Sequence, residues 1–543
     1  MTQRTTAPKG SSPQNVDAVV VGAGFAGLYA LYKLREELGL KVKVIDKAGG
    51  IGGTWYWNRY PGARCDSESY YYSYSFSPEI DQEWNWSERY ADHNEIRRYL
   101  NFVADKFDLR RDISLSTKVT SATYDSARDC WAVRTDVGLS FEAQFLVAAV
   151  GCLSTANVPD IPGINTFKGD WYHTGHWPHE GVDLTGKRVG QIGTGSTGIQ
   201  LAPELATVAD QLTVFQRTAN YSIPARNAPL TEAFQTEVRK NYPDIRAWAK
   251  RTTNGHPFDI RDQSALDVDA SERRRIYESA WETGGLRFRA AFRDILTDAR
   301  ANQTTSDFIR SKIRETVKDP VTAEILTPSD HGFATKRPPI DSHYFETFNR
   351  DNVSLVDLRA TPIEEITGAG IRTTDKEHEL DVIVFATGFD AITGSLEALN
   401  ITGPDGRTLR DNWDAGPRTY LGVQTPGFPN LFMITGPGSP SVLCNMPVAI
   451  EQHVEWVAQC IKHMRDAGLS RVEASPEAAE DWISEVKRAA NATLLPQAAS
   501  SWYLGANVPG KPQVFLPYAG GMAHVANICE DVAQNDYPGF IFN

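Results

Sequence analysis

The sequence predicts an α/β protein built from two Rossmann-like dinucleotide-binding domains with a helical insertion. Two glycine clusters of the form Gly-x-Gly-x-x-Gly, at 22–27 and 193–198, each follow a short β-branched run and open a helical pattern. A third observation is the charge-rich stretch over 228–330, where helical spacing dominates and strand signals are few. Two separate nucleotide sites in one chain are therefore expected.

The first domain begins after a polar segment. Residues 1–15 are rich in Ser, Thr and Pro, so we expect a disordered leader over this range. The β-branched run at 16–21, the helical spacing at 26–37 and a second β-branched run at 42–46 form one β-α-β unit. With the buried run at 145–151, these elements predict a first domain segment over 16–155.

The same order of elements returns after residue 186. We expect a strand at 188–192, a helix at 197–208 and a strand at 212–215, and the buried run at 382–388 closes this unit. The second domain is therefore predicted from the segments 156–227 and 331–389, on either side of the helical insertion. The last segment, 390–543, contains a clear helical pattern around 448–464, and we expect it to return to the first domain.

Composition limits the partners and the compartment. The chain has 543 residues and a net charge of −13, so its field repels nucleic acid, and no apolar run approaches the ~18–20 residues that cross a membrane. Six scattered cysteines without a Cys-x-x-Cys pair, and an N-terminus without an apolar leader, favour a reducing cytoplasm. These observations leave the oligomeric state open.

The first glycine cluster has the full context of a dinucleotide fingerprint. Gly22, Gly24 and Gly27 allow a tight turn and close approach of the main chain to a diphosphate, whose charge the helix N-terminus stabilises. Asp46, at the end of the next strand, is placed to accept hydrogen bonds from ribose hydroxyls. A chance turn is the alternative, but strand, helix and acid are all in register.

The second cluster differs at the position that selects the coenzyme. Its following strand ends at Arg217 and Thr218, with no carboxylate. A guanidinium can hold a 2′-phosphate through paired, charge-assisted hydrogen bonds, so this site is predicted to prefer NADPH over NADH, unless Arg217 is only a solvated surface charge. One acidic and one basic site together imply FAD plus NADPH, and hence a flavoprotein oxidoreductase.

Among such flavoproteins, disulfide reductases are disfavoured by the missing cysteine pair, which leaves N- or S-oxygenating and carbonyl-oxygenating monooxygenases. The stretch from Phe167 to Pro178 reads F-x-G-x-x-x-H-x-x-x-W-P, and Gly53 to Asp66 forms a second pattern. Both resemble the signatures of type I Baeyer–Villiger monooxygenases, closest to the phenylacetone, steroid and cyclohexanone monooxygenase group. The resemblance covers essentially the whole chain.

This resemblance implies NADPH- and O₂-dependent conversion of cyclic, aryl or steroid-like ketones to esters or lactones through an anionic C4a-peroxyflavin, with sulfoxidation as a side activity. The first domain would then bind FAD and the second NADP. Two alternatives stay open: an N- or S-oxygenating flavin monooxygenase, and a non-oxygenating flavoprotein that senses NADPH. A few pocket side chains set the ketone, so the sequence does not identify it.

The resemblance also implies the catalytic residues. Arg337 would favour an anionic oxygen species beside the flavin, and Asp66 would orient its guanidinium and balance its charge. An interdomain salt bridge is the alternative role for Arg337. His173 is expected to act as a hinge residue between domains. No metal is expected, because Gly175 and Pro178 interrupt the spacing of the nearby histidines.

The remaining cofactor contacts are carried over from the family residue by residue. The diphosphate of NADP is assigned to Thr194, Gly195, Ser196, Thr197, Gly198, Ile199 and Gln200. Lys336 joins Arg217 and Thr218 at the 2′-phosphate, and Trp502 is assigned to the nicotinamide-side ribose. The flavin contacts are Thr54, Trp55, Asp66, Tyr72, Val119 and Met446. The run 436–447 resembles the substrate-side loop.

Overall fold

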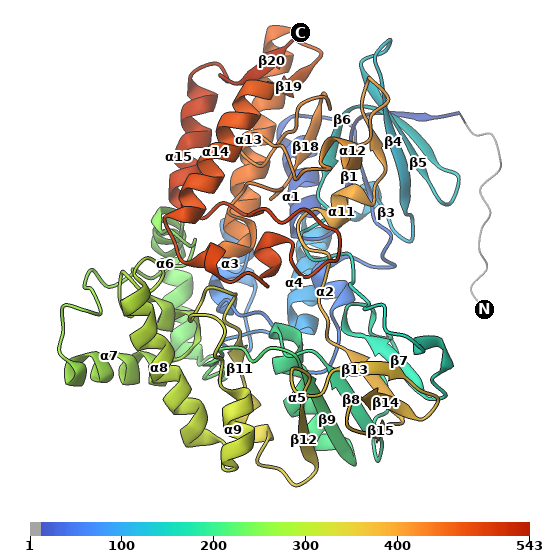
Figure 1. The fold of residues 1–543 in the computed structure, drawn as a ribbon. Coiled ribbons are helices and arrows are strands. Elements are labelled where there is room, and N and C mark those ends of the chain that lie inside the picture. The colour runs from blue at the N-terminus through green and yellow to red at the C-terminus, as the bar shows by residue number, and fades with distance from the viewer. Residues whose placement is uncertain (1–11) are drawn as a thin grey trace.

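The protein has two parallel-cored sheets, one above the other in Figure 1, with helices packed around each. The structure, a computed structural model, describes residues 12–543. In the first sheet the strand order is β17-β4-β5-β6-β1-β2-β3, and β18 also pairs with β6. Its strands are β1 (Gln14–Val21), β2 (Val42–Ile45), β3 (Ile113–Ser114), β4 (Val119–Asp125), β5 (Cys130–Thr135), β6 (Ser140–Ala148), β17 (Ile401–Thr402) and β18 (Leu431–Met433).

The prediction of a disordered leader over residues 1–15 is wrong for its last two residues. Strand β1 starts at Gln14, and Gln14 and Asn15 lie opposite Phe141 and Glu142 of β6. The polar side chains are exposed, but the backbone continues the ladder because β6 offers it hydrogen-bonding partners. Residues 1–11 of the predicted leader lie outside the described residues.

The second sheet has the strand order β12-β9-β8-β16-β7, and all its pairings are parallel. Its strands are β7 (Asp170–His173), β8 (Arg188–Ile192), β9 (Gln211–Gln216), β12 (Val353–Asp357) and β16 (Val382–Phe385). An antiparallel meander follows β12, formed by β13 (Ile363–Ile366), β14 (Gly370–Thr373) and β15 (Glu377–Glu379). The predicted strands of both β-α-β units are confirmed, whereas the meander was not predicted.

Helices pack on these sheets and form the insertion. Helix α1 (Phe25–Tyr32) continues through a π turn (Lys33–Glu37), and α5 (Ser196–Val208) follows the second glycine cluster. The insertion contains α6 (Glu232–Arg251), α7 (Ala270–Thr283), α8 (Ala299–Thr316) and α9 (Pro320–Leu326), at the lower left of Figure 1. The short paired strands β10 (Ile223–Pro224) and β11 (Ile340–Asp341) close its base.

The C-terminal segment returns to the first sheet through β17 and β18. Its long helices, α13 (Met446–Ala467), α14 (Pro476–Asn491) and α15 (Met522–Gln534), stand beside that sheet in Figure 1, and α13 packs on α1. The strands β19 (Val472–Ala474) and β20 (Phe540–Phe542) pair near the end of the chain. We keep the domain division of the sequence analysis as a proposal, supported by this distribution of strands between the sheets.

The other helices are short, apart from α4. They are α2 (Thr54–Trp57), α3 (Pro78–Glu83), α4 (His93–Lys106), α10 (Tyr344–Thr347), α11 (Gly394–Glu397) and α12 (Leu409–Asn412). Between residues 12 and 543, none of the helices would reach across a bilayer as an apolar segment.

Candidate active site

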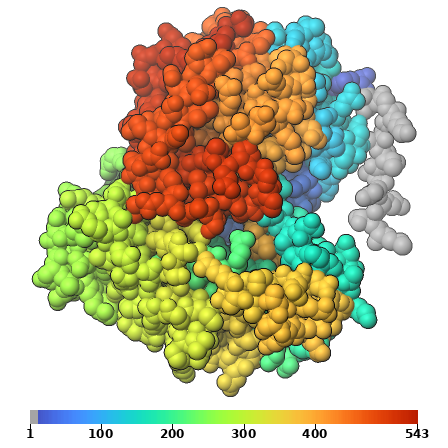
Figure 2. Space-filling model, in the orientation of Figure 1, coloured from blue at the N-terminus to red at the C-terminus, as the bar shows by residue number. Residues whose placement is uncertain are grey.

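A cavity of about 1060 Å³ lies where the two sheets and the C-terminal segment meet. Both glycine turns line it, as do residues of the C-terminal segment such as Met446 and Trp502. Figure 2 shows a hollow between the red C-terminal segment and the yellow and green segments below it. The cavity is therefore placed to contact two nucleotides and a substrate at once.

The first glycine turn is packed so closely that side chains are excluded. Gly22 has φ +113°, and a Cβ there would lie 2.3 Å from the carbonyl oxygen of Ala149. A Cβ on Gly27 would lie 1.7 Å from the carbonyl oxygen of Gly22. The turn thus holds the N-terminus of α1 against the end of β1, at the edge of the cavity that Gly22 and Gly24 line, and a helix N-terminus in this position favours a diphosphate.

The second glycine turn repeats this packing with one informative difference. Gly193 and Gly198 are again crowded by main-chain atoms, whereas a Cβ on Gly195 would meet nothing within 4 Å. The protein itself does not require glycine at 195, so the space in front of the α5 N-terminus is available to a ligand. A dinucleotide diphosphate fits this space, because the helix end stabilises negative charge.

Asp46 lines the cavity at the end of β2. Its two carboxylate oxygens accept hydrogen bonds from the backbone N–H groups of Ala23 (2.6 Å) and Ala48 (2.8 Å). Burial raises the pKa of Asp46, and these two bonds oppose the shift. The acid is thereby fixed beside the first glycine turn, with lone pairs left to accept from ribose hydroxyls.

Cations gather beside the second glycine turn. Arg217, Thr218 and Lys336 all line the cavity, and the Thr194 hydroxyl donates to the Thr218 carbonyl at 2.9 Å. Burial, together with the nearby charges of Arg217 and Arg359, lowers the pKa of Lys336, although Asp330 opposes this shift. Like charges held together in this way favour an anion between them, as a 2′-phosphate would supply.

Arg337 is held at the cavity by three contacts. Its Nε donates to Oδ2 of Asp66 at 2.9 Å, its Nη2 lies 2.9 Å from the same oxygen, and its Nη1 donates to the Val442 carbonyl at 2.7 Å. Burial disfavours the charged form, but the Asp66 carboxylate outweighs this and raises the pKa of Arg337 above its usual value. A permanent, oriented positive charge therefore faces the cavity.

Comparison with known proteins decides the family. A sequence model described as flavin-binding monooxygenase-like matches residues 16–228. A Baeyer-Villiger monooxygenase of Pseudooceanicola batsensis is 45% identical over 97% of this chain and 96% of its own. The chain belongs to the flavin-binding monooxygenase-like family.

Two further comparisons refine this membership. A phenazine N-monooxygenase of Lysobacter antibioticus is 45% identical and covers 97% of both chains. The solved structure of an oxidized steroid monooxygenase bound to NADP is 53% identical, with a TM-score of 0.93, and covers 97% of this chain and 99% of that one. This flavin-binding monooxygenase therefore has the predicted fold class and uses FAD and NADPH, which confirms the resemblance to Baeyer–Villiger monooxygenases.

Most site residues predicted for this flavin-binding monooxygenase lie around the one cavity. Those that line it are Gly22, Gly24, Asp46, Thr54, Trp55, Asp66, Tyr72, Val119, Thr194, Gly195, Ser196, Thr197, Gln200, Arg217, Thr218, Lys336, Arg337, Met446 and Trp502. Three others do not, namely Gly27, Gly198 and Ile199. The Ile199 side chain is fully buried in the core and its N–H bonds to the Gly195 carbonyl, so it supports the turn from behind.

The side chain of Gln200 has a use that the sequence did not indicate. Its Oε1 accepts from the Tyr60 hydroxyl at 2.8 Å, and its Nε2 donates to the Arg64 carbonyl at 3.0 Å. The amide therefore joins helix α5 to the segment that follows α2, and its predicted contact with the NADP diphosphate stays a prediction. Tyr60 belongs to the sequence pattern 53–66, which marks it as a residue of interest. The pattern does not identify Gln200 as its partner, because the two residues are far apart in the chain.

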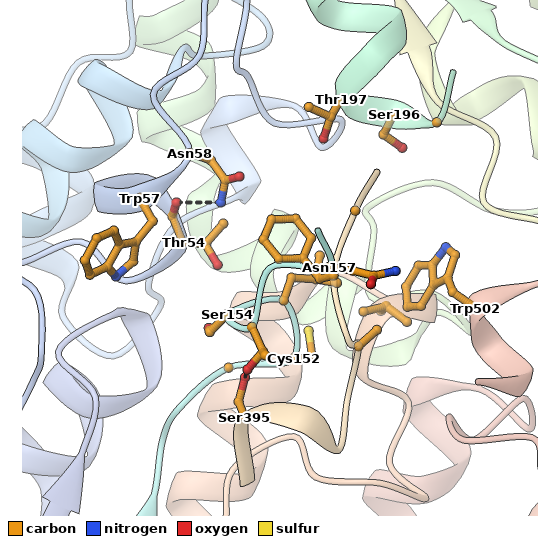
Figure 3. Close-up of a pocket in the computed structure, with 18 of the residues that line it drawn as sticks. Thr54, Trp57, Asn58, Cys152, Ser154, Asn157, Ser196, Thr197, Ser395 and Trp502 are labelled. Atoms are coloured by element: carbon orange, nitrogen blue, oxygen red, sulfur yellow. Dashed lines mark hydrogen bonds between the residues drawn. The ribbon is translucent and has the colours of Figure 1, made fainter. Parts of the chain in front are cut away.

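The flavin-side residues predicted from the family pattern pack on one another. The Trp55 indole N–H donates to the Tyr72 hydroxyl at 3.2 Å, and the two rings meet edge to face. Figure 3 shows Thr54 on one side of the cavity and Trp502 on the opposite side. The side chain of Asn157 lies between them and points toward Trp502. Asn157, which the sequence reasoning missed, donates to the Asn507 carbonyl at 3.1 Å and so connects the segment between β6 and β7 to the C-terminal segment.

His173 ends β7 and is 3% exposed. Its Nδ1 accepts from the Gly175 N–H at 3.0 Å, and its Nε2 is buried without a partner among the described atoms. Burial, followed by the neighbouring His176, lowers the pKa of His173 to about 4, so the ring is neutral at pH 7. In the part of the chain that the structure describes, no group of three or more His, Cys, Asp or Glu side chains could hold a metal ion.

Proposed function

We propose that this monooxygenase converts ketones to esters or lactones with NADPH and O₂, and that Arg337 and Asp66 are its catalytic pair. When bound, FAD supplies the activation of oxygen, after reduction by NADPH. The observation that carries the proposal is the Arg337 guanidinium, held at the cavity by Asp66 and by the Val442 carbonyl. A fixed cation in a cavity of low polarity stabilises negative charge that develops during attack on a carbonyl carbon.

The other residues of the cavity divide into binding roles. The two glycine turns and Asp46 hold FAD and NADP, and Arg217 with Lys336 holds the 2′-phosphate. The turn Ser441–Leu443 covers the substrate side, where the carbonyl of Val442 fixes Arg337. Small ketones and O₂ are the partners, with sulfoxidation as a side activity. All six cysteines are free thiols, the state expected in a reducing cytoplasm, where we place the enzyme.

N-oxygenation is the second candidate, favoured by the relative from Lysobacter antibioticus that is named a phenazine N-monooxygenase. Attack by an amine on activated oxygen needs a proton donor rather than a fixed positive charge. Arg337 is paired and permanently charged, so its geometry favours the carbonyl reaction.

The test is a product screen. Purified holoenzyme is incubated with NADPH, O₂ and linear, cyclic, aryl or steroidal ketones, or with aromatic amines, and products are identified by mass. Esters or lactones from ketones are expected, at rates well above N-oxide formation. N-oxides without any ester would overturn the proposal in favour of the second candidate, and NADPH consumption that stays low with every substrate would favour a sensing role.

A further inference from the structure

The two groups that hold Arg337 come from different parts of the chain. Asp66 belongs to the segment that follows α2, and the Val442 carbonyl belongs to the turn just before α13. The guanidinium keeps one orientation only if both acceptors are themselves held in place. Whatever fixes these two segments relative to one another therefore also fixes Arg337.

A loop of the helical insertion contacts the segment of Asp66. This loop, residues 252–256, follows α6, and its last residue, His256, is 3% exposed. Nε2 of His256 lies 3.1 Å from Oγ of Ser67, the residue next to Asp66. Ser67 lines the cavity together with Asp66 and Arg337. The insertion thus reaches the catalytic pair through one side-chain hydrogen bond.

The direction of this hydrogen bond follows from the other ring nitrogen. Nδ1 of His256 is buried and has no partner within residues 12–543. A buried N–H group without a partner costs more than an unused lone pair, so the proton belongs on Nε2, which donates to Ser67. Burial, with the charges of nearby arginines, lowers the pKa of His256 to about 3, so the ring is neutral at pH 7. Phe258 and Tyr71 pack against the ring and fix its plane.

The same loop holds the segment of Val442. The carbonyl of Asn254 accepts from the backbone N–H of Asn445, the N-cap residue of α13, at 2.8 Å. Within the loop, the side-chain oxygen of Asn254 accepts from the His256 N–H at 3.2 Å. The Thr252 hydroxyl donates to the His256 carbonyl at 2.8 Å. One internally bonded loop therefore contacts both segments that hold Arg337.

We propose that the loop 252–256 positions Arg337 by holding both of its acceptors, with His256 as the positioning residue on the Asp66 side. The inference rests on the proposed function, since it concerns the geometry of the same site. His256 is not among the residues that line the cavity, so it acts through Ser67. A small displacement of the guanidinium weakens the stabilisation of negative charge during oxygen transfer, while hydride delivery by NADPH is unaffected.

The experiment removes this hydrogen bond from either side. His256→Phe keeps a ring against Phe258 and Tyr71 but cannot donate, and Ser67→Ala removes the acceptor. In each purified holoenzyme, kcat for ester formation should fall by about 3-fold to 10-fold, the equivalent of one neutral hydrogen bond, and more of the NADPH should end as H₂O₂. KM for NADPH and the rate of flavin reduction should stay at wild-type values. The double variant should be no slower than either single variant, because both substitutions delete one bond.

A rescue variant and a matched control accompany these substitutions. His256→Gln should recover part of the loss, because a glutamine amide can donate from about the position of Nε2. His378→Phe is the control, since Nε2 of His378 likewise lies 3.2 Å from a hydroxyl, that of Thr373, but in the meander β13–β15. This control should keep the wild-type kcat and the wild-type yield of H₂O₂.

The midpoint potential of the bound flavin gives a reading that does not depend on turnover. A positive charge near the flavin ring stabilises its reduced, anionic form, so Arg337→Ala should lower the potential. His256→Phe and Ser67→Ala should shift it in the same direction by a smaller amount, and His378→Phe should leave it unchanged.

Wild-type kcat and H₂O₂ yield in both single variants would overturn the inference. Additive losses in the double variant would overturn it too, as would a loss that disappears once rates are expressed per bound flavin. If no ketone yields an ester with the wild-type enzyme, the proposed function fails, and the potentials alone decide the positioning role: a shared shift supports it and unchanged potentials overturn it.

Discussion

At the scale of single residues, the reactivity of this enzyme depends on where a few charges are fixed. Two nitrogens of the Arg337 guanidinium contact Asp66, and the third donates to the Val442 carbonyl of a different segment. Together these contacts fix the orientation of the guanidinium. Sequence reasoning identified this pair through the family pattern alone, because Asp66 and Arg337 are far apart in the chain. It did not predict the contact with the Val442 carbonyl. Every residue has a backbone carbonyl, so the side-chain type at position 442 gives no sign of this bond.

Replacing Arg337 with Ala should leave reduction of the flavin by NADPH intact and strongly decrease ester formation. Without the fixed cation, oxygen consumption should yield H₂O₂, and the ester yield should fall by about 10²–10³-fold. Arg337→Lys should recover only part, because a point charge lacks the planar donor pair. Stopped-flow reduction followed by mixing with oxygen, with ester measured in parallel, checks this. Ester formation at a near wild-type rate in Arg337→Ala would withdraw the assignment.

Arg217 decides the coenzyme in our assignment. Arg217→Ala should raise the KM for NADPH by about 10-fold to 100-fold while NADH kinetics change little, since only a contact to the 2′-phosphate is lost. Steady-state kinetics with both coenzymes measure this directly. A similar loss with NADPH and NADH would mean that Arg217 supports the fold of the site instead.

At the scale of elements, the parallel strands were predictable and the meander was not. Residues 18–21 of β1 and nearly all of β8 and β16 are buried, so their apolar runs carry a signal without alternation. Strands β13 to β15 are short, partly exposed and rich in charge, as in the Arg372–Glu365 pair, and such sequences resemble loops. The Gln200 amide bonds were likewise invisible, because they depend on how α5 docks against a distant segment.

His173 tests the link between elements, since it ends β7 just before the chain enters the second β-α-β unit. His173→Ala should retain FAD but slow turnover by about 10²-fold, because a small displacement of one nucleotide relative to the other is costly for hydride transfer. Flavin content from the absorbance spectrum, together with kcat, checks this. A purified variant that has lost its flavin would assign His173 to folding or cofactor retention.

At the scale of the whole molecule, charged contacts tie the insertion to the first domain. Glu68 is 4% exposed and pairs with Arg89 at 2.6 Å and with Arg287 at 3.2 Å. Burial raises the pKa of Glu68, but the two arginines outweigh it and the net pKa is lowered. Since the folded-state pKa lies below the unfolded one, this stabilisation is present above the unfolded pKa and is lost as the pH falls through the folded pKa.

Glu68→Gln should therefore lower Tm at pH 7 and matter less in acid. We expect the free energy of unfolding at pH 7 to fall by about 2–4 kcal/mol. This is less than the ~3–5 kcal/mol lost when a fully buried ion pair is broken, because both arginines are partly exposed. Thermal unfolding of both proteins at pH 7 and below pH 4 measures the difference. A Tm gap that does not narrow in acid would show that packing, not charge, joins the two parts here.

The pairing of β18 with β6 has a consequence for biosynthesis. Residues 146–148 at the end of β6 receive β18 only from residues 431–433, after the whole second domain has been made. At roughly 5–20 residues per second, a nascent chain on the ribosome waits for tens of seconds with this edge uncovered. Such an edge is a template for wrong pairing, so translation speed and chaperone supply should govern the yield of active protein. Chains released after residue 389 should aggregate, which solubility measurements on truncated translation products can check.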